Sequence, residues 1–255
     1  MPVGFLEGVG YLLEHYWPLF LRGLGTTLLL AALGTIFGFI LGMGLATLHL
    51  IPKSPQETRL QQVGRLLAKG FSRLYIQIFR GTPMMVQAII IYYGAMRLWG
   101  SWPALLAGIV VVSLNTAAYI AEIIRAGINA IDKGQHEAAR SLGLTYGQTM
   151  RRIILPQAIK NVIPSIGNEF IVNVKDTSVL NVIAVTELFY NSTSISMTFY
   201  RQFEVFFITS VLYFIITLLA TAFLNGVDRR LGVRSVVGIP TSATVPFPTH
   251  REDPQ

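Results

Sequence analysis

Residues 24–50 read LGTTLLLAALGTIFGFILGMGLATLHL, and His49 is the only titratable side chain among them. A helix needs roughly 20 mostly apolar residues to cross the hydrocarbon core of a bilayer, so this stretch predicts a transmembrane helix. Small residues recur along it at every fourth position, at Gly34, Gly38, Gly42 and Ala46. Such a stripe favours close approach of a second helix, although glycine is also generally tolerated in membrane helices.

The whole chain has the composition of a protein that crosses the membrane several times. Of its 255 residues, 52% are hydrophobic and only 13% are charged, whereas an average soluble domain has about 25% charged residues. The mean hydropathy is +0.54. This composition argues against a soluble enzyme, a disordered chain and a coiled coil. The chain has no cysteine, which excludes a disulfide framework, a thiolate metal site and a cysteine nucleophile.

Four further apolar segments follow the first span. The second covers residues 84–96 and is long enough to cross the bilayer only if residues 74–80 contribute, with Gly81 and Pro83 as a break between them. The remaining three cover residues 103–124, 164–185 and 205–225. Together the segments predict an all-α integral membrane protein with five transmembrane helices per subunit.

The basic residues predict the orientation of the chain. Of the 20 Lys and Arg residues, 16 lie in residues 51–80, residues 125–160 or the C-terminal tail. Because cytoplasmic loops of membrane proteins carry an excess of Lys and Arg, this distribution predicts an N-out, C-in topology. It also explains the net charge of +7 better than a nucleic-acid partner does, and we expect no nucleic acid to bind.

The predicted topology divides the chain into three parts. Residues 1–22 are expected to form an extracellular-side segment, and residues 23–226 the transmembrane domain. Residues 227–255 are expected to form a cytoplasmic tail, which is disordered where it is rich in Pro, Ser and Thr.

A loop at about residues 131–156, IDKGQHEAARSLGLTYGQTMRRIILP, follows the third span. Asp132 is a good N-cap for a short helix, and Gly143 is suited to the left-handed position that ends it. Thr145 and Gln148 form a capping box for a second helix, which Pro156 either breaks or restarts. The loop is therefore a helix–turn–helix. It could be a plain connector or a DNA-reading motif, but its small and apolar residues better suit docking of a cytoplasmic partner.

This loop resembles the EAA signature of ABC importer permeases. The matching residues are Glu137-Ala138-Ala139, then Gly143 after three residues, and Ile153-Ile154-Leu155-Pro156 after nine more. The polar amino acid branch of that family, with its histidine, glutamine and arginine permeases, is also similar over four stretches. These are FRGTPMMVQ (79–87), SLNTAAYIAEIIRAGI (113–128), LPQAIKNVIPSIGNEFI (155–171) and KDTSVLNVIAVTEL (175–188).

The resemblance implies a type I ABC importer permease fold in a bacterial cell (inner) membrane. It implies a second permease subunit, identical or not, and an extracellular or periplasmic amino acid binding protein. It also implies a cytoplasmic ATPase subunit that docks on the loop, which we call the coupling loop (residues 131–156). The residues expected to couple the two chains are Glu137, Ala138, Ala139, Leu142 and Gly143.

The chain itself is not expected to be an enzyme. A phosphate-binding P-loop needs a Gly-Lys pair, which does not occur anywhere in the sequence. ATP is therefore expected to be bound by the partner ATPase, with no cofactor in this chain. The four His residues are scattered, so no metal site is expected.

Polar residues inside the predicted spans are candidates for a substrate path, because such residues are costly in a membrane and usually functional. Glu169, Asn173 and Asp176 share one helical face, with Asn168 as a weaker candidate. Arg80, Thr82 and Gln87 flank the predicted break, and Asn115 lies in the third span. For Asn173 and its neighbours an interhelical structural network is the alternative, and Arg80 could simply mark the cytoplasmic boundary.

The interpretation that combines these features is a permease subunit that carries polar amino acids inward. The main alternative is a self-sufficient secondary transporter with Glu169 or Asp176 as a proton or ion site.

Overall fold

The structure is a computed structural model that describes residues 4–50 and 57–232. All regular elements in these residues are helical, which confirms the predicted all-α class. The elements are α1 (Phe5–Leu50), α2 (Arg59–Gly81), α3 (Met84–Trp99), α4 (Ala104–Asn129), α5 (Lys133–Ser141), α6 (Tyr146–Thr149), a π-helical turn (Met150–Ile154), α7 (Leu155–Asp176), a 3-10 helix (Thr177–Ile183), α8 (Leu188–Phe199) and α9 (Gln202–Arg230).

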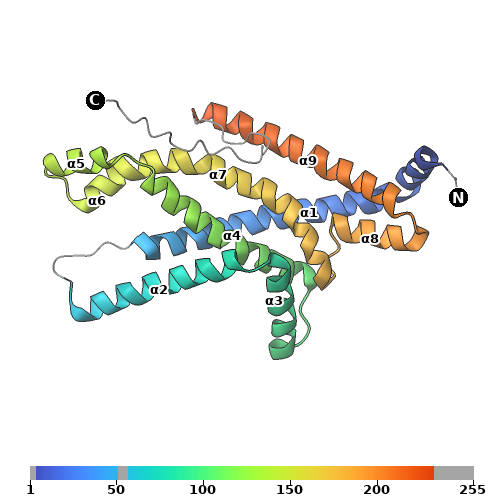
Figure 1. The fold of residues 1–255 in the computed structure, drawn as a ribbon, viewed down its shortest axis with the longest axis horizontal. Coiled ribbons are helices and arrows are strands. Elements are labelled where there is room, and N and C mark those ends of the chain that lie inside the picture. Colours follow the sequence, from blue (N-terminus) through green and yellow to red (C-terminus); the bar gives the residue numbers. More distant parts are fainter. Residues whose placement is uncertain (1–3, 51–56, 233–255) are drawn as a thin grey trace, which may run out of the picture.

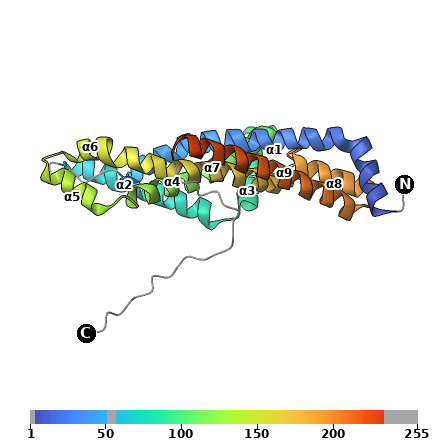
Figure 2. The ribbon, with the colours of Figure 1, turned by 90° about the horizontal axis from the view of Figure 1, so that it is seen from above.

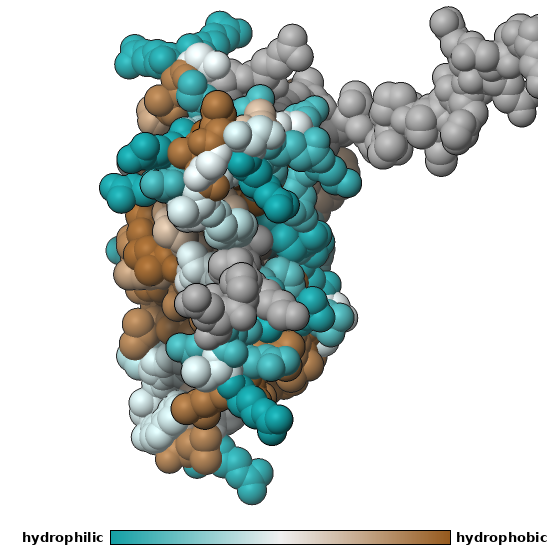
Figure 3. Space-filling view, turned by 90° about the vertical axis from the view of Figure 1, so that its left-hand side faces the viewer, coloured by the Kyte–Doolittle hydropathy of each residue, from teal (hydrophilic) through white to brown (hydrophobic). Residues whose placement is uncertain are grey.

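The helices form one elongated bundle. Helices α5 and α6 lie at one end of its long axis, whereas α8 and the start of α1 lie at the other, in both views (Figures 1 and 2). Helix α3 projects sideways from the middle of the bundle (Figure 1). Seen from the α5–α6 end, the surface is largely hydrophilic, with apolar patches between the polar side chains (Figure 3). This end therefore suits an aqueous environment.

Among the described residues, three helices are long and apolar enough to cross a membrane, namely α1, α4 and α9. The pair α2 and α3 makes a fourth candidate, although the two helices are bent by 111° at the break. The break lies where Gly81 and Pro83 predicted it. The five-span count and the topology remain predictions.

The expected fourth span, residues 164–185, does not form as one helix. Helix α7 begins earlier, at Leu155, and ends at Asp176. Residues Thr177–Ile183 form a 3-10 helix that closes with Ala184 in the left-handed conformation. The apolar sequence after Asp176 resembles a continuing helix, but the chain turns there.

Helix α1 also differs from expectation, because it starts at Phe5 and includes most of the segment expected to precede the first span. Its first turns are set at an angle to the remainder (Figure 1). Pro18 lies inside the helix, and a proline there bends a helix because it lacks an N–H and its ring clashes with the preceding turn. At the other end of the chain α9 extends to Arg230, so the first residues of the expected tail, 227–230, are helical. Residues 233–255 of that tail lie outside the described residues.

The glycine stripe of α1 packs directly on α4, as predicted. A Cβ atom on Gly38 would lie 2.7 Å from the Cβ of Thr116, and one on Gly42 would lie 2.8 Å from the carbonyl oxygen of Ala117. Neither distance leaves room for a side chain. The backbones of α1 and α4 therefore approach closely enough to form the centre of the bundle.

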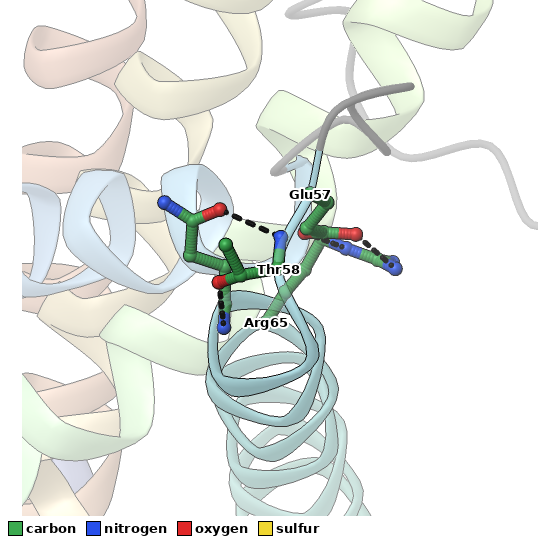
Figure 4. Close-up of polar contacts among 4 residues, drawn as sticks. Glu57, Thr58 and Arg65 are labelled. Atoms are coloured by element: carbon green, nitrogen blue, oxygen red, sulfur yellow. Dashed lines mark hydrogen bonds and ion pairs between the residues drawn. The ribbon is translucent and has the colours of Figure 1, made fainter.

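The start of α2 is determined by local hydrogen bonds (Figure 4). The Thr58 hydroxyl accepts from the backbone N–H of Gln61, and the Gln61 side chain accepts from the N–H of Thr58. Arg65 donates two hydrogen bonds to the carboxylate of Glu57, at 2.8 and 3.0 Å. This capping box begins the helix that leads to the break.

Candidate functional site

The first helix of the coupling loop has the predicted ends. Asp132 caps α5 by accepting from the N–H of Gly134 at 2.6 Å. Gly143 has a φ of +74°, and its N–H donates to the carbonyl of Arg140 at 2.9 Å. The N–H of Leu144 donates to the carbonyl of Ala139 at 3.1 Å. These two bonds form a Schellman motif, which reverses the chain within two residues and favours glycine at position 143.

The second helix of the coupling loop continues into the bundle without interruption. Thr145 and Gln148 form the predicted capping box of α6. The π-helical turn Met150–Ile154 then joins α6 to α7, and Pro156 lies in the first turn of α7. A proline is tolerated there because the N–H of a first-turn residue lacks a helical partner anyway. Pro156 was predicted to break the helix or to restart it, and the structure shows a restart. Residues Tyr146–Asp176 form one continuous helical rod, and Pro156 lies in the first turn of its α7 part.

Most of the predicted coupling residues are accessible to a partner. Glu137, Ala138 and Gly143 are exposed, and Leu142 is 79% exposed at the tip of the loop. Ala139 is the exception, because it is buried and packs inside the loop. The loop thus presents an apolar side chain beside a tight turn.

The break between α2 and α3 brings three predicted path residues together. Pro83 lacks the N–H that would bond the carbonyl of Phe79 in a continuous helix. The side-chain amide of Gln87 donates to that carbonyl at 2.9 Å, and also to the carbonyl and hydroxyl oxygens of Thr82 at 2.9 Å each. Asn115 of α4 donates to the Gln87 amide oxygen at 2.9 Å. These residues stabilise the break and attach it to α4.

Arg80 lies at the end of α2 and faces α4. Its guanidinium is 5.5 Å from the ring centroid of Tyr119, and its Nη1 is 3.8 Å from Oε1 of Glu122. Glu122 also accepts a hydrogen bond from Nε of Arg125 at 2.8 Å. On α4 the adjacent residues Asn115 and Thr116 bond Gln87 beside the break and Asn173 of α7. The break and the polar face of α7 therefore border the same region.

The predicted polar face of α7 divides into two parts. Asn173 is only 3% exposed; its amide donates to the hydroxyls of Thr35 at 2.9 Å and Thr116 at 3.0 Å. It therefore connects α7 to α1 and α4, which favours the structural alternative for this residue. Asn168 and Asp176 are exposed, and Glu169 is half-buried, so these three are accessible from outside the bundle.

Glu187 is a buried polar residue that sequence reasoning missed. Its carboxylate accepts from the backbone N–H groups of Phe189 at 2.9 Å and Tyr190 at 2.6 Å, and so caps α8. It also accepts from the hydroxyls of Tyr213 at 3.0 Å and Thr27 at 3.5 Å. The residue thereby joins α1, α8 and α9. An acidic residue just before an apolar helix start was the available signal.

Comparison with known proteins identifies the fold. Residues 63–233 match the family described as "Binding-protein-dependent transport system inner membrane component", so the match includes the coupling loop and the polar face of α7. The chain belongs to this family. It is a permease subunit of an ABC importer, as the resemblance implied.

Curated relatives align with the permease over most of both chains. The arginine transport system permease protein ArtQ of Bacillus subtilis is 36% identical over 215 residues, which are 84% of this chain and 93% of the relative. The putative glutamine transport system permease protein GlnP of Rickettsia felis is 34% identical over 224 residues, or 87% and 97% of the two chains.

Solved structures show the same fold. A chain of an amino acid ABC transporter crystallised with histidines is 40% identical, with a TM-score of 0.77 over 90% of the permease and 100% of that chain. A chain of the MetNI methionine ABC transporter is 21% identical, with a TM-score of 0.66 over 84% and 96% of the two chains. The second match concerns the fold alone.

Proposed function

We propose that this permease carries polar amino acids into the cell, as one membrane subunit of an importer driven by a separate ATPase. The observation that supports this most strongly is the helical rod Tyr146–Asp176. One end of the rod belongs to the exposed coupling loop, and the other bears Glu169 and Asp176. The helix between them is continuous but contains Pro164, so a displacement of the loop reaches the polar face through a helix that bends at this position.

The family match supports the proposed partners, and the exposed coupling loop fits them. A cytoplasmic ATPase subunit receives the coupling loop, with Glu137, Ala138, Leu142 and Gly143 at the contact and Ala139 supporting it from within. A second permease subunit, identical or different, completes the path, and a binding protein on the outer side delivers the substrate. ATP binding brings the two coupling loops together and opens the outer side. We place the complex in a bacterial inner membrane with the topology N-out, C-in.

The proposed path uses the accessible polar side chains. The side-chain oxygen atoms of Glu169, Asp176 and Asn168 can accept hydrogen bonds from the ammonium group of an amino acid. Arg80, at the neighbouring break, can donate to its carboxylate. The names of the relatives, which include arginine and glutamine permeases, support an amino acid as the substrate. Thr82, Gln87 and Asn115 act indirectly, because they hold the break that positions Arg80.

Reconstitution tests the proposed function. The permease is inserted into vesicles with its ATPase and binding protein, and uptake of labelled arginine, glutamine and histidine is measured with and without ATP. We expect uptake only when all components and ATP are present. Uptake by the permease alone, driven by a proton gradient, would instead show a secondary transporter.

The topology has a test of its own, because the chain has no native cysteine. Single cysteines at the exposed positions Ser141 and Ser194 are treated with a membrane-impermeant thiol reagent on intact cells. Only the cysteine at position 194 is expected to react. Labelling at position 141 from outside would reverse the proposed orientation.

A further inference from the structure

An apolar groove runs between α1, α4 and α7 at the coupling-loop end of the bundle. Its volume is about 360 Å³, which is within the range of small-molecule sites. Phe39 and Met43 of α1, Ile128 of α4 and Ile159 of α7 are among the residues that line it. Met43 and Ile159 are 44% and 53% exposed, so the groove opens on the surface.

The lining offers no free polar group. Thr47 is its one polar residue, and the Thr47 hydroxyl donates to the carbonyl of Gly44 at 2.7 Å. A ligand that fills the groove must therefore itself be apolar along its length, because a polar group buried there would lack a hydrogen-bond partner.

The groove has the length of one bilayer leaflet. At the coupling-loop end, the groove reaches Thr47 of α1 and Ile128 of α4. Each of these residues lies within one turn of the C-terminal end of its helix. Along α7 it extends from Leu155 to Ile166, which is about 16 Å of helix. Half of a hydrocarbon core of about 30 Å has nearly the same extent. With the orientation proposed above, this is the cytoplasmic leaflet.

Two arginines precede the coupling-loop end of the groove in the chain. Arg151 and Arg152 are exposed in the π-helical turn, four and three residues before Leu155. In the described part of the chain, no acidic side chain lies within ion-pair distance of either arginine. Basic side chains beside intramembrane pockets on the cytoplasmic side are suited to anionic headgroups.

We propose that this groove binds an anionic phospholipid of the cytoplasmic leaflet. One acyl chain lies between α1, α4 and α7, and the phosphate contacts Arg151 and Arg152. The charge of the two arginines favours this occupant over a neutral lipid, and the apolar lining favours it over a soluble phosphate compound. The site is separate from the polar face of α7. Its two arginines belong to the last part of the coupling loop, and they are not among the residues proposed to contact the ATPase.

A photo-crosslinking experiment tests the proposal without any transport readout. The full-length permease in its complex is reconstituted with phosphatidylglycerol or phosphatidylcholine that carries a diazirine on the acyl chain, and the labelled peptides are identified by mass spectrometry. We expect labelling of the peptides around Met43 and Ile159, stronger for phosphatidylglycerol. Each arginine is expected to contribute about fivefold to that preference.

Two double variants provide the matched comparison. R151Q/R152Q is expected to abolish the preference for phosphatidylglycerol in the groove. R229Q/R230Q removes the same charge from another exposed arginine pair, at the end of α9, and is expected to retain it. The single variant Ile159→Trp, at an exposed lining position, is expected to reduce labelling at Met43 by either lipid.

Three outcomes would overturn the proposal. The first is equal labelling of the groove by the two lipids in the unaltered protein. The second is an equal loss of preference in both double variants. The third is an absence of lipid labelling in the groove, including the case in which crosslinking shows a second permease subunit there.

Discussion

The side-chain amide of Gln87 donates a hydrogen bond to the carbonyl of Phe79 at 2.9 Å, in the place of the N–H that Pro83 lacks. The break between α2 and α3 is therefore a hydrogen-bonded structure and not a flexible joint. Asn115 adds a contact to α4 from the other side of the same amide. The 111° bend is consequently part of the folded bundle.

Gln87→Leu is expected to destabilise the permease by about 1 kcal/mol, because it leaves the partly buried carbonyl of Phe79 without its side-chain donor. Heat-induced loss of the monodisperse peak in size-exclusion chromatography measures this change. Gln77→Leu, at an exposed position of α2, is the control and is expected to have little effect. If the two variants lose the monodisperse peak at the same midpoint temperature, the side-chain amide of Gln87 does not stabilise the break.

Gly143→Ala is expected to weaken association with the ATPase subunit while membrane insertion stays normal. A non-glycine residue raises the free energy of a left-handed backbone conformation by roughly 1–2 kcal/mol. The substitution therefore destabilises the turn at the tip of the loop. Gly147→Ala is a close control, since a Cβ atom at either glycine meets nothing within 4 Å and only Gly143 has a positive φ. Co-purification of the ATPase is the measurement, and equal recovery with both variants would contradict the coupling role.

Glu187→Ala is expected to cost roughly 2 kcal/mol or more, because it removes the cap of α8 and leaves the Tyr213 hydroxyl without its acceptor. Glu187→Gln retains one side-chain oxygen and is expected to recover part of the loss. Thermal unfolding of the purified protein compares the two variants with Glu7→Ala, an exposed control. If the unfolding temperature of Glu187→Ala equals that of Glu7→Ala, the carboxylate of Glu187 does not contribute to stability.

Glu169→Gln and Asn173→Leu are expected to have different effects. Glu169 is accessible from the proposed path, so its substitution should change the KM or the selectivity of amino acid uptake at normal complex yield. Asn173 connects three helices, so its substitution should lower thermal stability, by about 1 kcal/mol on the scale of hydrogen bonds between membrane helices. Uptake kinetics and unfolding midpoints separate the two roles. Unchanged kinetics for Glu169→Gln across several amino acids would remove that residue from the path.

Local features of this fold could be predicted from the sequence, because they depend on nearby residues. The glycine stripe of α1, the caps at Asp132 and Thr145, and the break at Gly81 and Pro83 each depend on residues within a few turns. The boundaries of α1 and α7 could not be predicted in the same way. Helix α1 continues through Glu7 and Glu14, and α7 ends before an apolar segment, so hydropathy alone misplaced both ends.

The polar contacts between distant segments were harder to predict. The acceptor role of Glu187 depends on Thr27, 160 residues away, and on Tyr213, 26 residues away. For Asn173 the sequence left a path role and a structural role open, and the hydrogen bonds to Thr35 and Thr116 favour the second. Only the three-dimensional packing of α1, α4 and α9 around these residues distinguishes a connecting side chain from an accessible one.

The hydrogen bonds of Asn173 attach one end of α7 to α1 and α4. Leu155 lies 18 residues before Asn173, or about 27 Å along the helix axis, whereas Glu169 lies four residues before it, or about 6 Å. Pro164 lies inside the helix between Leu155 and Glu169, at a position where α7 lacks one backbone hydrogen bond and can bend. If the coupling-loop end of α7 moves, the bend at Pro164 and the attachment at Asn173 limit how far Glu169 moves with it.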